Sequence, residues 1–258
     1  MTCAISRGYP DSMAEVRVGI SGWTYRGWRG DFYPNGLPQR EELAHAASRM
    51  TSIEINGSFY ALQKPTSYQK WRDQTPDDFV FAVKGSRFIS HMKRLADAEE
   101  PLKRFFDSGV WELGHKLGPI LWQLPETIQY DEERLATFFD QLPRTSPTGA
   151  EVRYALEFRS KTFEQPAAYS LLREHRIACV LADAAGRWPK VEEDTADFRY
   201  VRLHGDAELY TSGYDDRSLD AWARKIKGWG QDTFVYFDND AKGYAPHDAE
   251  RLIQRLGR

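Results

Sequence analysis

Eight short apolar runs recur along the chain, each ending at a polar or charged residue or, in the first run, at a tryptophan. The runs cover residues 16–22, 52–55, 79–83, 120–122, 154–156, 179–182, 200–203 and 234–237. Short, continuously apolar segments are typical of parallel strands that are buried on both faces. Eight of them predict an α/β fold, a (β/α)₈ TIM barrel whose functional groups lie at the C-terminal ends of the strands.

Most of the segments between these runs carry apolar residues at helical spacing. They predict helices over residues 40–47, 66–74, 101–106, 131–141, 166–174, 218–227 and 247–256. Asp131 is the expected N-cap of the fourth helix. Residues 184–197, between the sixth and seventh runs, are too few for a loop and a full helix. We therefore expect a shortened or irregular crossover there.

The chain length and the spacing of the runs predict a single domain over residues 16–258, preceded by an N-terminal tail over residues 1–15. Met13 stands just before the first run and could be the native start. Cys3 falls in the tail and Cys179 in the sixth run, which argues against a disulfide framework or a thiolate metal site. No apolar run approaches the length of a membrane span, so we expect a cytoplasmic protein without membrane contact.

Charge and motifs narrow the classes of function. A formal net charge of −3 at pH 7 argues against a wholly basic nucleic-acid binder, although it allows a local basic patch. The chain has no Gly-rich dinucleotide fingerprint, no Walker-type phosphate loop and no Gly-x-Ser-x-Gly elbow. These absences argue against nicotinamide redox chemistry, NTP hydrolysis and serine hydrolysis, and no cofactor is predicted.

The alternation of side chains along a strand predicts which strand-end residues face the barrel interior. Glu54, Glu157 and Arg202 fall on one face of their strands, as do Lys84 and His204. An alanine two positions before Lys84, and another before Glu157, leaves space for these longer side chains. We predict that the five residues converge at the mouth of the barrel, the C-terminal ends of the strands.

Two sets of residues are candidates for function. The predicted catalytic set can transfer protons or act as nucleophiles and comprises Glu54, Lys84, Glu157, Asp183 and His204. The predicted ligand-binding set combines cationic, amide, acidic and aromatic side chains: Trp23, Tyr25, Asn56, Tyr60, Arg87, His91, Gln123, Arg159, Arg202, Asp238 and Asn239. Its arginines favour a phosphate or carboxylate as the ligand.

Several functions remain open. The first is an enzyme that applies acid/base chemistry to a small anionic substrate such as a phosphorylated sugar. The basic residues within 84–94, beside aromatic rings, indicate instead a nucleic-acid-binding or nucleic-acid-processing barrel. Two facing carboxyl groups among Glu54, Glu157 and Asp183 would indicate a glycoside hydrolase. The charges could also merely balance one another in a buried mouth.

A metal site has weak support in the sequence. Of six histidines only His204 ends a strand, which argues against zinc, and no metal ligand is predicted. A hard cation such as magnesium on the carboxylates stays open. The oligomeric state does not follow from the sequence.

Several motifs together resemble the YecE-like family of uncharacterised TIM-barrel proteins. They are GISGWTY at 19–25, IEIN at 53–56, FVFAVK at 79–84, QLP at 123–125, EFR at 157–159 and YVRLHG at 200–205. The resemblance runs from about residue 16 to the C-terminus, with departures such as Asp238 where the family pattern has Asn. The resemblance implies a TIM barrel, and it implies no particular activity because none is established for the family.

Overall fold

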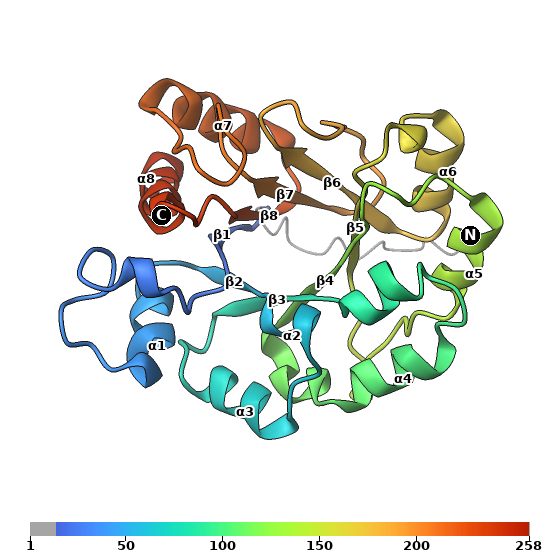
Figure 1. Ribbon diagram of the computed structural model, residues 1–258, viewed down its shortest axis with the longest axis horizontal. Helices are drawn as coiled ribbons and strands as arrows, with labels where there is room; N and C mark the ends of the chain where they lie inside the picture. The colour runs from blue at the N-terminus through green and yellow to red at the C-terminus, as the bar shows by residue number, and fades with distance from the viewer. Residues whose placement is uncertain (1–13, 258) are drawn as a thin grey trace, which may run out of the picture.

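The computed structural model of the chain describes residues 14–257, in which eight parallel strands close into a barrel in chain order (Figure 1). The strands are β1 (Val16–Ser21), β2 (Ser52–Ile55), β3 (Val80–Lys84), β4 (Leu117–Gln123), β5 (Tyr154–Glu157), β6 (Ile177–Asp183), β7 (Phe198–Leu203) and β8 (Asp232–Phe237). Pairing of β1 with β8 closes the ring. The predicted TIM barrel is confirmed, whereas most of the predicted tail, residues 1–13, lies outside the described residues.

Helices lie around the outside of the strands (Figure 1). They are α1 (Glu42–Ala47), α2 (Gly57–Tyr60), α3 (Pro65–Asp73), α4 (Glu99–Asp107), α5 (Glu132–Asp140), α6 (Pro166–Glu174), α7 (Asp216–Trp229) and α8 (Tyr244–Leu256). Asp131 caps α5 as predicted, because its side chain accepts a hydrogen bond from the backbone N–H of Arg134. The short helix α2 was not predicted, since four residues are too few to show a helical period.

The crossover between β6 and β7 is irregular, as predicted. Residues 184–197, all of them described, form no helix. The chain turns at Ala185 and Gly186, which both have positive φ (48° and 76°). Two residues after this turn, Trp188 packs against the rings of His204 and Tyr210 at the mouth, with centroid distances of 5.2 and 6.0 Å. This loop therefore contributes to the site instead of covering the barrel wall.

The barrel interior is filled unevenly, and this creates room at the mouth. On the side of β7 and β8, Tyr200 and Tyr236 pack with ring centroids 5.2 Å apart. On the opposite side, β3 and β5 contribute Ala82 and Ala155, two positions before Lys84 and Glu157. The small alanines leave volume above them that longer polar side chains can occupy.

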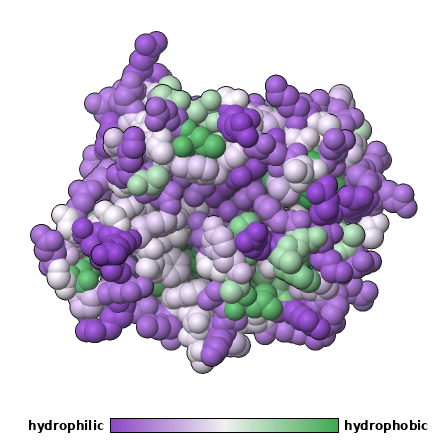
Figure 2. Space-filling view, viewed as in Figure 1, coloured by the Kyte–Doolittle hydropathy of each residue, from purple (hydrophilic) through white to green (hydrophobic). Residues whose placement is uncertain are grey.

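Strands β1 and β2 approach each other closely at Gly19. A Cβ atom on this residue would lie 1.7 Å from the backbone oxygen of Ser52, so only glycine fits at this position. Figure 2 shows the same side of the molecule, where hydrophilic side chains predominate and hydrophobic ones form small separate patches. Among residues 14–257 no helix has the length and apolar character needed to cross a membrane.

Candidate functional site

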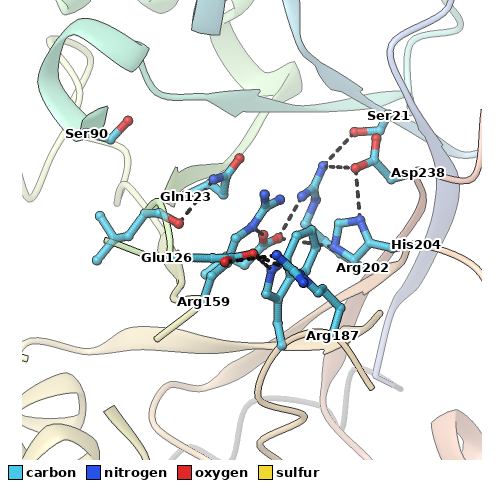
Figure 3. Close-up of polar contacts among 12 residues, drawn as sticks. Ser21, Ser90, Gln123, Glu126, Arg159, Arg187, Arg202, His204 and Asp238 are labelled. Atoms are coloured by element: carbon cyan, nitrogen blue, oxygen red, sulfur yellow. Dashed lines mark hydrogen bonds and ion pairs between the residues drawn. The ribbon is translucent and has the colours of Figure 1, made fainter. Parts of the chain in front are cut away.

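A fully buried arginine organises the charged residues at the mouth. Arg202 of β7 has no exposed surface. Its Nη2 lies 2.9 Å from Asp238 Oδ2 (Figure 3). The same Nη2 lies 2.9 Å from Glu54 Oε1, and Nη1 lies 2.6 Å from Glu157 Oε2. One guanidinium thus binds three carboxylates from β2, β5 and the end of β8. We call these four residues the charge cluster.

Neutral donors complete the environment of Glu54. The Ser21 hydroxyl donates to Glu54 Oε1, and the Tyr200 hydroxyl donates to Oε2 at 2.6 Å. Arg202 Nε donates to the same Oε2 at 3.1 Å. Both carboxylate oxygens are therefore occupied within the protein, and Glu54 has no free oxygen to present to a ligand.

The other two carboxylates are held in the ionised form. Burial acts to raise the pKa of Glu157, but the guanidiniums of Arg202 and Arg159 outweigh it and hold the pKa well below its usual range. Arg159 Nε lies 2.9 Å from Glu157 Oε1. Burial likewise opposes ionisation of Asp238, and Arg202 and His204 lower its pKa strongly. Neither group can serve as a protonated acid near neutral pH.

His204 is enclosed between the charge cluster and aromatic rings. Its Nδ1 lies 3.0 Å from Asp238 Oδ2 and its Nε2 lies 3.5 Å from Glu157 Oε2. Its ring packs edge-on against Trp188 and Tyr210 at 5.2 and 5.5 Å. The imidazole has no exposed surface, so its contacts support the two carboxylates from within the barrel.

A cavity of about 940 Å³ opens at the mouth. The residues around it are Gly22, Trp23, Thr24, Tyr25, Asn56, Gly57, Phe59, Tyr60, Trp71, Lys84, Arg87, His91, Gln123, Arg159, Tyr210, Asp238, Asp240 and Ala241. This volume lies in the range of small-molecule sites. Aromatic rings and cationic groups share the lining, which suits a ligand that has both an apolar or ring-shaped part and a negative charge.

Lys84 is the cation with the most unusual environment in this cavity. Its side chain is only 8% exposed, and its Nζ lies 4.4 Å from the centre of the Phe59 ring. Within residues 14–257 the ammonium has no hydrogen-bond or ion-pair partner. Burial, followed by the positive charge of Arg202, lowers the pKa of Lys84 to about 8. The amine is therefore buried and lines the cavity, and the carboxylates of the charge cluster act on it without forming an ion pair.

Two arginines add positive charge to the same cavity. The Arg159 guanidinium stacks on the Trp188 ring at 3.5 Å, and its Nη2 donates to the Tyr210 hydroxyl at 3.3 Å. These contacts fix its orientation. Arg87, which precedes the helical turn Phe88–Met92, is exposed and makes no ion pair with any residue between 14 and 257. An anion in the cavity would meet one fixed and one adaptable guanidinium.

Amide and imidazole groups lie beside these cations. Asn56 donates through Nδ2 to Ser21 Oγ at 3.0 Å, while its Oδ1 is buried without a partner among the described residues. His91 Nδ1 lies 2.9 Å from Ser90 Oγ, and its Nε2 lies 3.4 Å from Gln123 Nε2. Burial and then the positive charges of Lys84 and the arginines lower the pKa of His91 to about 4. His91 is therefore neutral at pH 7.

Aromatic side chains form another part of the cavity lining, which we call the aromatic wall. Trp23 packs edge-on against Trp71 of α3 with ring centroids 5.3 Å apart. The Tyr25 hydroxyl donates to the backbone oxygen of Ser21 at 2.5 Å, and Tyr60 at the end of α2 is 71% exposed. Exposed and half-buried rings of this kind can stack on the flat or apolar face of a ligand.

The structure corrects two of the predicted site residues. Asp183 and Asn239 point out of the barrel, because the neighbouring Ala182 and Asp238 occupy the inward positions. Asp183 pairs with Lys190, 2.8 Å away. Asn239 donates to the backbone oxygen of Ser212 and to Asp248, both at 2.9 Å. Neither side chain reaches the cavity.

The remaining predicted catalytic residues divide into two groups. Glu54, Glu157 and His204 converge with Arg202 as predicted, but all are fully buried and none lines the cavity. Lys84 lines the cavity and makes no ion pair with the charge cluster. The carboxyl pair that a glycoside hydrolase requires is not formed by Glu54, Glu157 and Asp183, because each is bonded to an arginine or lysine.

Sequence reasoning missed several residues of the cavity wall. Asp240 falls two positions after Asp238, so strand alternation extended by one step would have included it. Burial and the nearby Asp238 raise the pKa of Asp240. Trp71 lies on α3, away from the strand ends, so the eight runs do not indicate it.

The basic segment after β3 does not form a continuous positive strip. Lys93 lies 3.8 Å from Asp97, and Arg94 donates to the side chain and backbone of Thr127 at 3.2 and 2.8 Å. Lys84 is buried in the cavity. Arg87 and Arg94 are both exposed and make no ion pair among residues 14–257, but the Lys93–Asp97 pair lies between them in the chain. Among all of residues 14–257, no three His, Cys, Asp or Glu side chains are grouped so as to hold a metal ion.

Comparison with known proteins places the chain among relatives of the same fold. The family model described as "Protein of unknown function DUF72" matches residues 17–258. The UPF0759 protein YunF of Bacillus subtilis is 23% identical over 93% of this chain and 94% of its own length. The UPF0759 protein YecE of Escherichia coli K12 is 28% identical over 86% of this chain and 84% of its own length.

A solved structure supports the same assignment. The crystal structure of a DUF72 family protein from Thermotoga maritima superposes with a TM-score of 0.81 at 25% sequence identity. The match covers 95% of this chain and 100% of that chain. The barrel described above is therefore the fold that this relative also adopts, and the mouth of the barrel lies within the matched part.

Proposed function

Since the chain belongs to the DUF72 family of proteins of unknown function, we propose its function from its own site: the mouth binds a small organic anion, such as a phosphorylated sugar, and acts on it by acid/base chemistry. The observation that carries this proposal is the environment of Lys84. A buried ammonium without an ion-pair partner is costly unless a negative charge meets it. A ligand anion in the adjoining cavity would provide that charge.

The surrounding residues fit the two halves of such a ligand. Arg159, held by Trp188 and Tyr210, offers a fixed guanidinium for bidentate contact with a phosphate or carboxylate. Arg87 can close on the same anion from the exposed side of the cavity. Trp23 and Tyr60 would pack against the carbon skeleton, as aromatic rings commonly do with sugars.

The acid/base role falls to groups that reach the cavity. Lys84, with a pKa lowered to about 8, can exchange a proton near neutral pH. Glu54 and Glu157 instead maintain the positive side chains of Arg202 and Arg159 in position. This assignment differs from a simple two-carboxylate mechanism, because the carboxylates of the charge cluster have their oxygens committed to arginine.

Binding of inorganic sulfate and of a hexose 6-phosphate, measured by isothermal titration calorimetry, tests the proposal. We expect the hexose phosphate to bind more tightly than sulfate, because it also contacts the aromatic wall. Lys84→Met is expected to weaken both affinities at least tenfold, by about 1.4 kcal/mol or more. Lys70→Met, which changes an exposed lysine of α3, is the matched control and should leave both affinities unchanged.

Two outcomes would overturn the proposal. One is equal affinity of the Lys84→Met variant and the unaltered protein, with circular dichroism showing that both are folded. The other is tight, steeply salt-dependent binding of a single-stranded oligonucleotide together with no binding of the hexose phosphate, which would favour the nucleic-acid alternative. Lys84→Arg keeps the charge, and retained sulfate binding in this variant would support charge as the basis of recognition.

A further inference from the structure

We propose that Lys84 is a covalent nucleophile, forming a Schiff base with the carbonyl carbon of an anionic aldehyde or ketone bound at the mouth. The inference rests on the proposed anion site and narrows its ligand to one chemical class. That class is a small carbonyl compound that also carries a phosphate or carboxylate group. The phosphate or carboxylate would bind the arginines, and the carbonyl would reach the lysine.

The two buried lysines of the described chain differ in one decisive respect. Lys116 is 4% exposed and donates through Nζ to the backbone oxygens of Arg72 and Thr75 at 2.7 and 2.9 Å. These bonds give it a structural role. Lys84 is similarly buried, yet its Nζ has no hydrogen-bond acceptor within residues 14–257 and lies over the Phe59 ring. Its lone pair, once deprotonated, is free to attack a ligand.

Electrostatics favours the neutral amine at Lys84. Burial and the charge of Arg202 lower its pKa to about 8, against the opposing effect of Asp238 and the two glutamates of the charge cluster. Near pH 8 about half of the Lys84 side chains are then neutral. An ordinary lysine with a pKa near 10.4 is neutral in only about 0.4% of molecules at the same pH. The geometry and the lowered pKa both favour nucleophilic attack.

The reaction balances without an oxidant or reductant. The neutral amine attacks the carbonyl carbon, a C–N bond forms, and the C=O π pair moves to the oxygen, which takes up a proton. Loss of a proton from nitrogen gives the carbinolamine. The nitrogen lone pair then forms the C=N bond as the protonated hydroxyl leaves as water. Asp240 lines the same cavity, and burial together with the charge of Asp238 raises its pKa, so it can exchange these protons with the oxygen and the nitrogen.

The position of Arg159 gives the covalent step its selectivity. Its guanidinium is fixed by the Trp188 ring at 3.5 Å and by the Tyr210 hydroxyl at 3.3 Å. An aldehyde held there by its phosphate would be presented repeatedly to the Lys84 amine, which raises the effective concentration of the carbonyl. Aldehydes without an anionic group lack this anchor and should react slowly.

Trapping with pyridoxal 5′-phosphate and sodium borohydride tests the inference on the full chain. Reduction converts the imine to a stable secondary amine, which peptide mass spectrometry locates. We expect one modification per molecule, at Lys84, and at least tenfold less modification by pyridoxal, which lacks the phosphate. Excess sulfate should suppress the reaction by occupying the anion site. Lys84→Arg should abolish it, whereas Lys70→Met should leave it unchanged.

The pH dependence of trapping provides an independent readout. The groups that act on Lys84 are Arg202, Asp238 and the glutamates of the charge cluster, and His91 and Arg159 line the same cavity. The lowered pKa values of Glu157 and Asp238 keep both ionised above pH 6, and the pKa of His91, about 4, keeps it neutral. The initial trapping rate at Lys84 should therefore rise with pH and level off above about 8.

The outcomes separate this inference from the proposed function. Label spread over exposed lysines such as Lys64 and Lys70, or equal labelling by pyridoxal and its phosphate, would overturn the Schiff-base inference. If calorimetry still shows sulfate binding that depends on Lys84, the anion site stands without covalent chemistry. If sulfate binding is also independent of Lys84, both proposals fail.

Discussion

At the scale of single residues, Arg202 determines what the carboxylates at the mouth can do. Its guanidinium contacts Glu54, Glu157 and Asp238 within 2.6–2.9 Å and has no contact with solvent. A buried ion network of this kind stabilises the fold little relative to apolar side chains, yet removal of one partner leaves charge without compensation. The network therefore fixes geometry and prevents the carboxylates from acting as free acids or bases.

Replacement of Arg202 by methionine tests this role. Arg202→Met should lower the free energy of unfolding by about 3–5 kcal/mol at pH 7, because three carboxylates lose their common partner. Urea denaturation followed by circular dichroism measures the change. The loss should be smaller at pH 5, since the uncompensated carboxylates can then take up protons more readily.

The matched control is Arg40→Met, which removes an exposed ion pair with Glu41. It should change the free energy of unfolding by less than about 1 kcal/mol. A similarly small effect of Arg202→Met would show that the charge cluster is not coupled through its arginine.

The alternation of side chains along the strands predicted which residues face the charge cluster, but it did not predict that the carboxylates bind an arginine instead of a ligand. Placement of Glu54, Glu157 and Arg202 on inward faces follows from the two-residue period of a strand, and the structure agrees. The same period places Asp183 outside the barrel, next to the inward Ala182. Whether an inward carboxylate meets a ligand or an arginine depends on its depth in the barrel and on contacts from distant strands, which the local pattern does not contain.

At the scale of elements, the long periodic segments were predictable and the short ones were not. Helix α6 has the predicted bounds, Pro166–Glu174, whereas α7 begins at Asp216 because the preceding Asp215 accepts the backbone N–H of Ser218. The turn Phe88–Met92, which places His91 in the cavity, is too short for a periodic signal. Local hydrogen bonds and tertiary contacts determine such elements, and both depend on residues outside the segment.

A buried lysine binds the end of α3. Lys116 Nζ donates to the backbone oxygen of Arg72, in the last turn of the helix, and to that of Thr75, two residues beyond its end; the Thr75 hydroxyl also donates to the Arg72 oxygen. Lys116→Met should lower the free energy of unfolding by about 1–3 kcal/mol, since buried acceptors lose their donor. Chemical denaturation measures this, and calorimetry should show sulfate affinity unchanged because Lys116 does not line the cavity.

A substitution on the same helix provides the comparison. Lys70→Met removes an exposed ammonium from the last turn of α3 and should alter stability by no more than about 0.5 kcal/mol. Loss of sulfate binding in Lys116→Met, without loss of folded protein, would mean that α3 and its Trp71 position the site more directly than the contacts indicate.

At the scale of the whole molecule, closure of the barrel and the position of the cavity are linked. The rings of Tyr200 and Tyr236 fill one side of the interior, and Ala82 and Ala155 leave space on the other. Eight apolar runs suffice to predict the closed sheet. They do not predict this asymmetry, because it arises from which strands become opposite one another after closure.

Closure also requires two strands to approach without a side chain between them. A Cβ on Gly19 would lie 1.7 Å from the backbone oxygen of Ser52, so Gly19→Ala must separate β1 from β2. We expect the variant to lose more than about 4 kcal/mol of unfolding free energy, because backbone atoms cannot rotate away as a side chain can. Gly27→Ala, where an added Cβ meets nothing within 4 Å, should stay within about 0.5 kcal/mol of the unaltered protein. Urea denaturation of the two variants compares them directly, and insolubility of Gly19→Ala beside soluble Gly27→Ala would agree with the expectation. Equal stability of the two variants would contradict this expectation. It would mean that β1 can move far enough to accommodate the added methyl group without loss of unfolding free energy, so that close approach of β1 and β2 at Gly19 is not required for barrel closure.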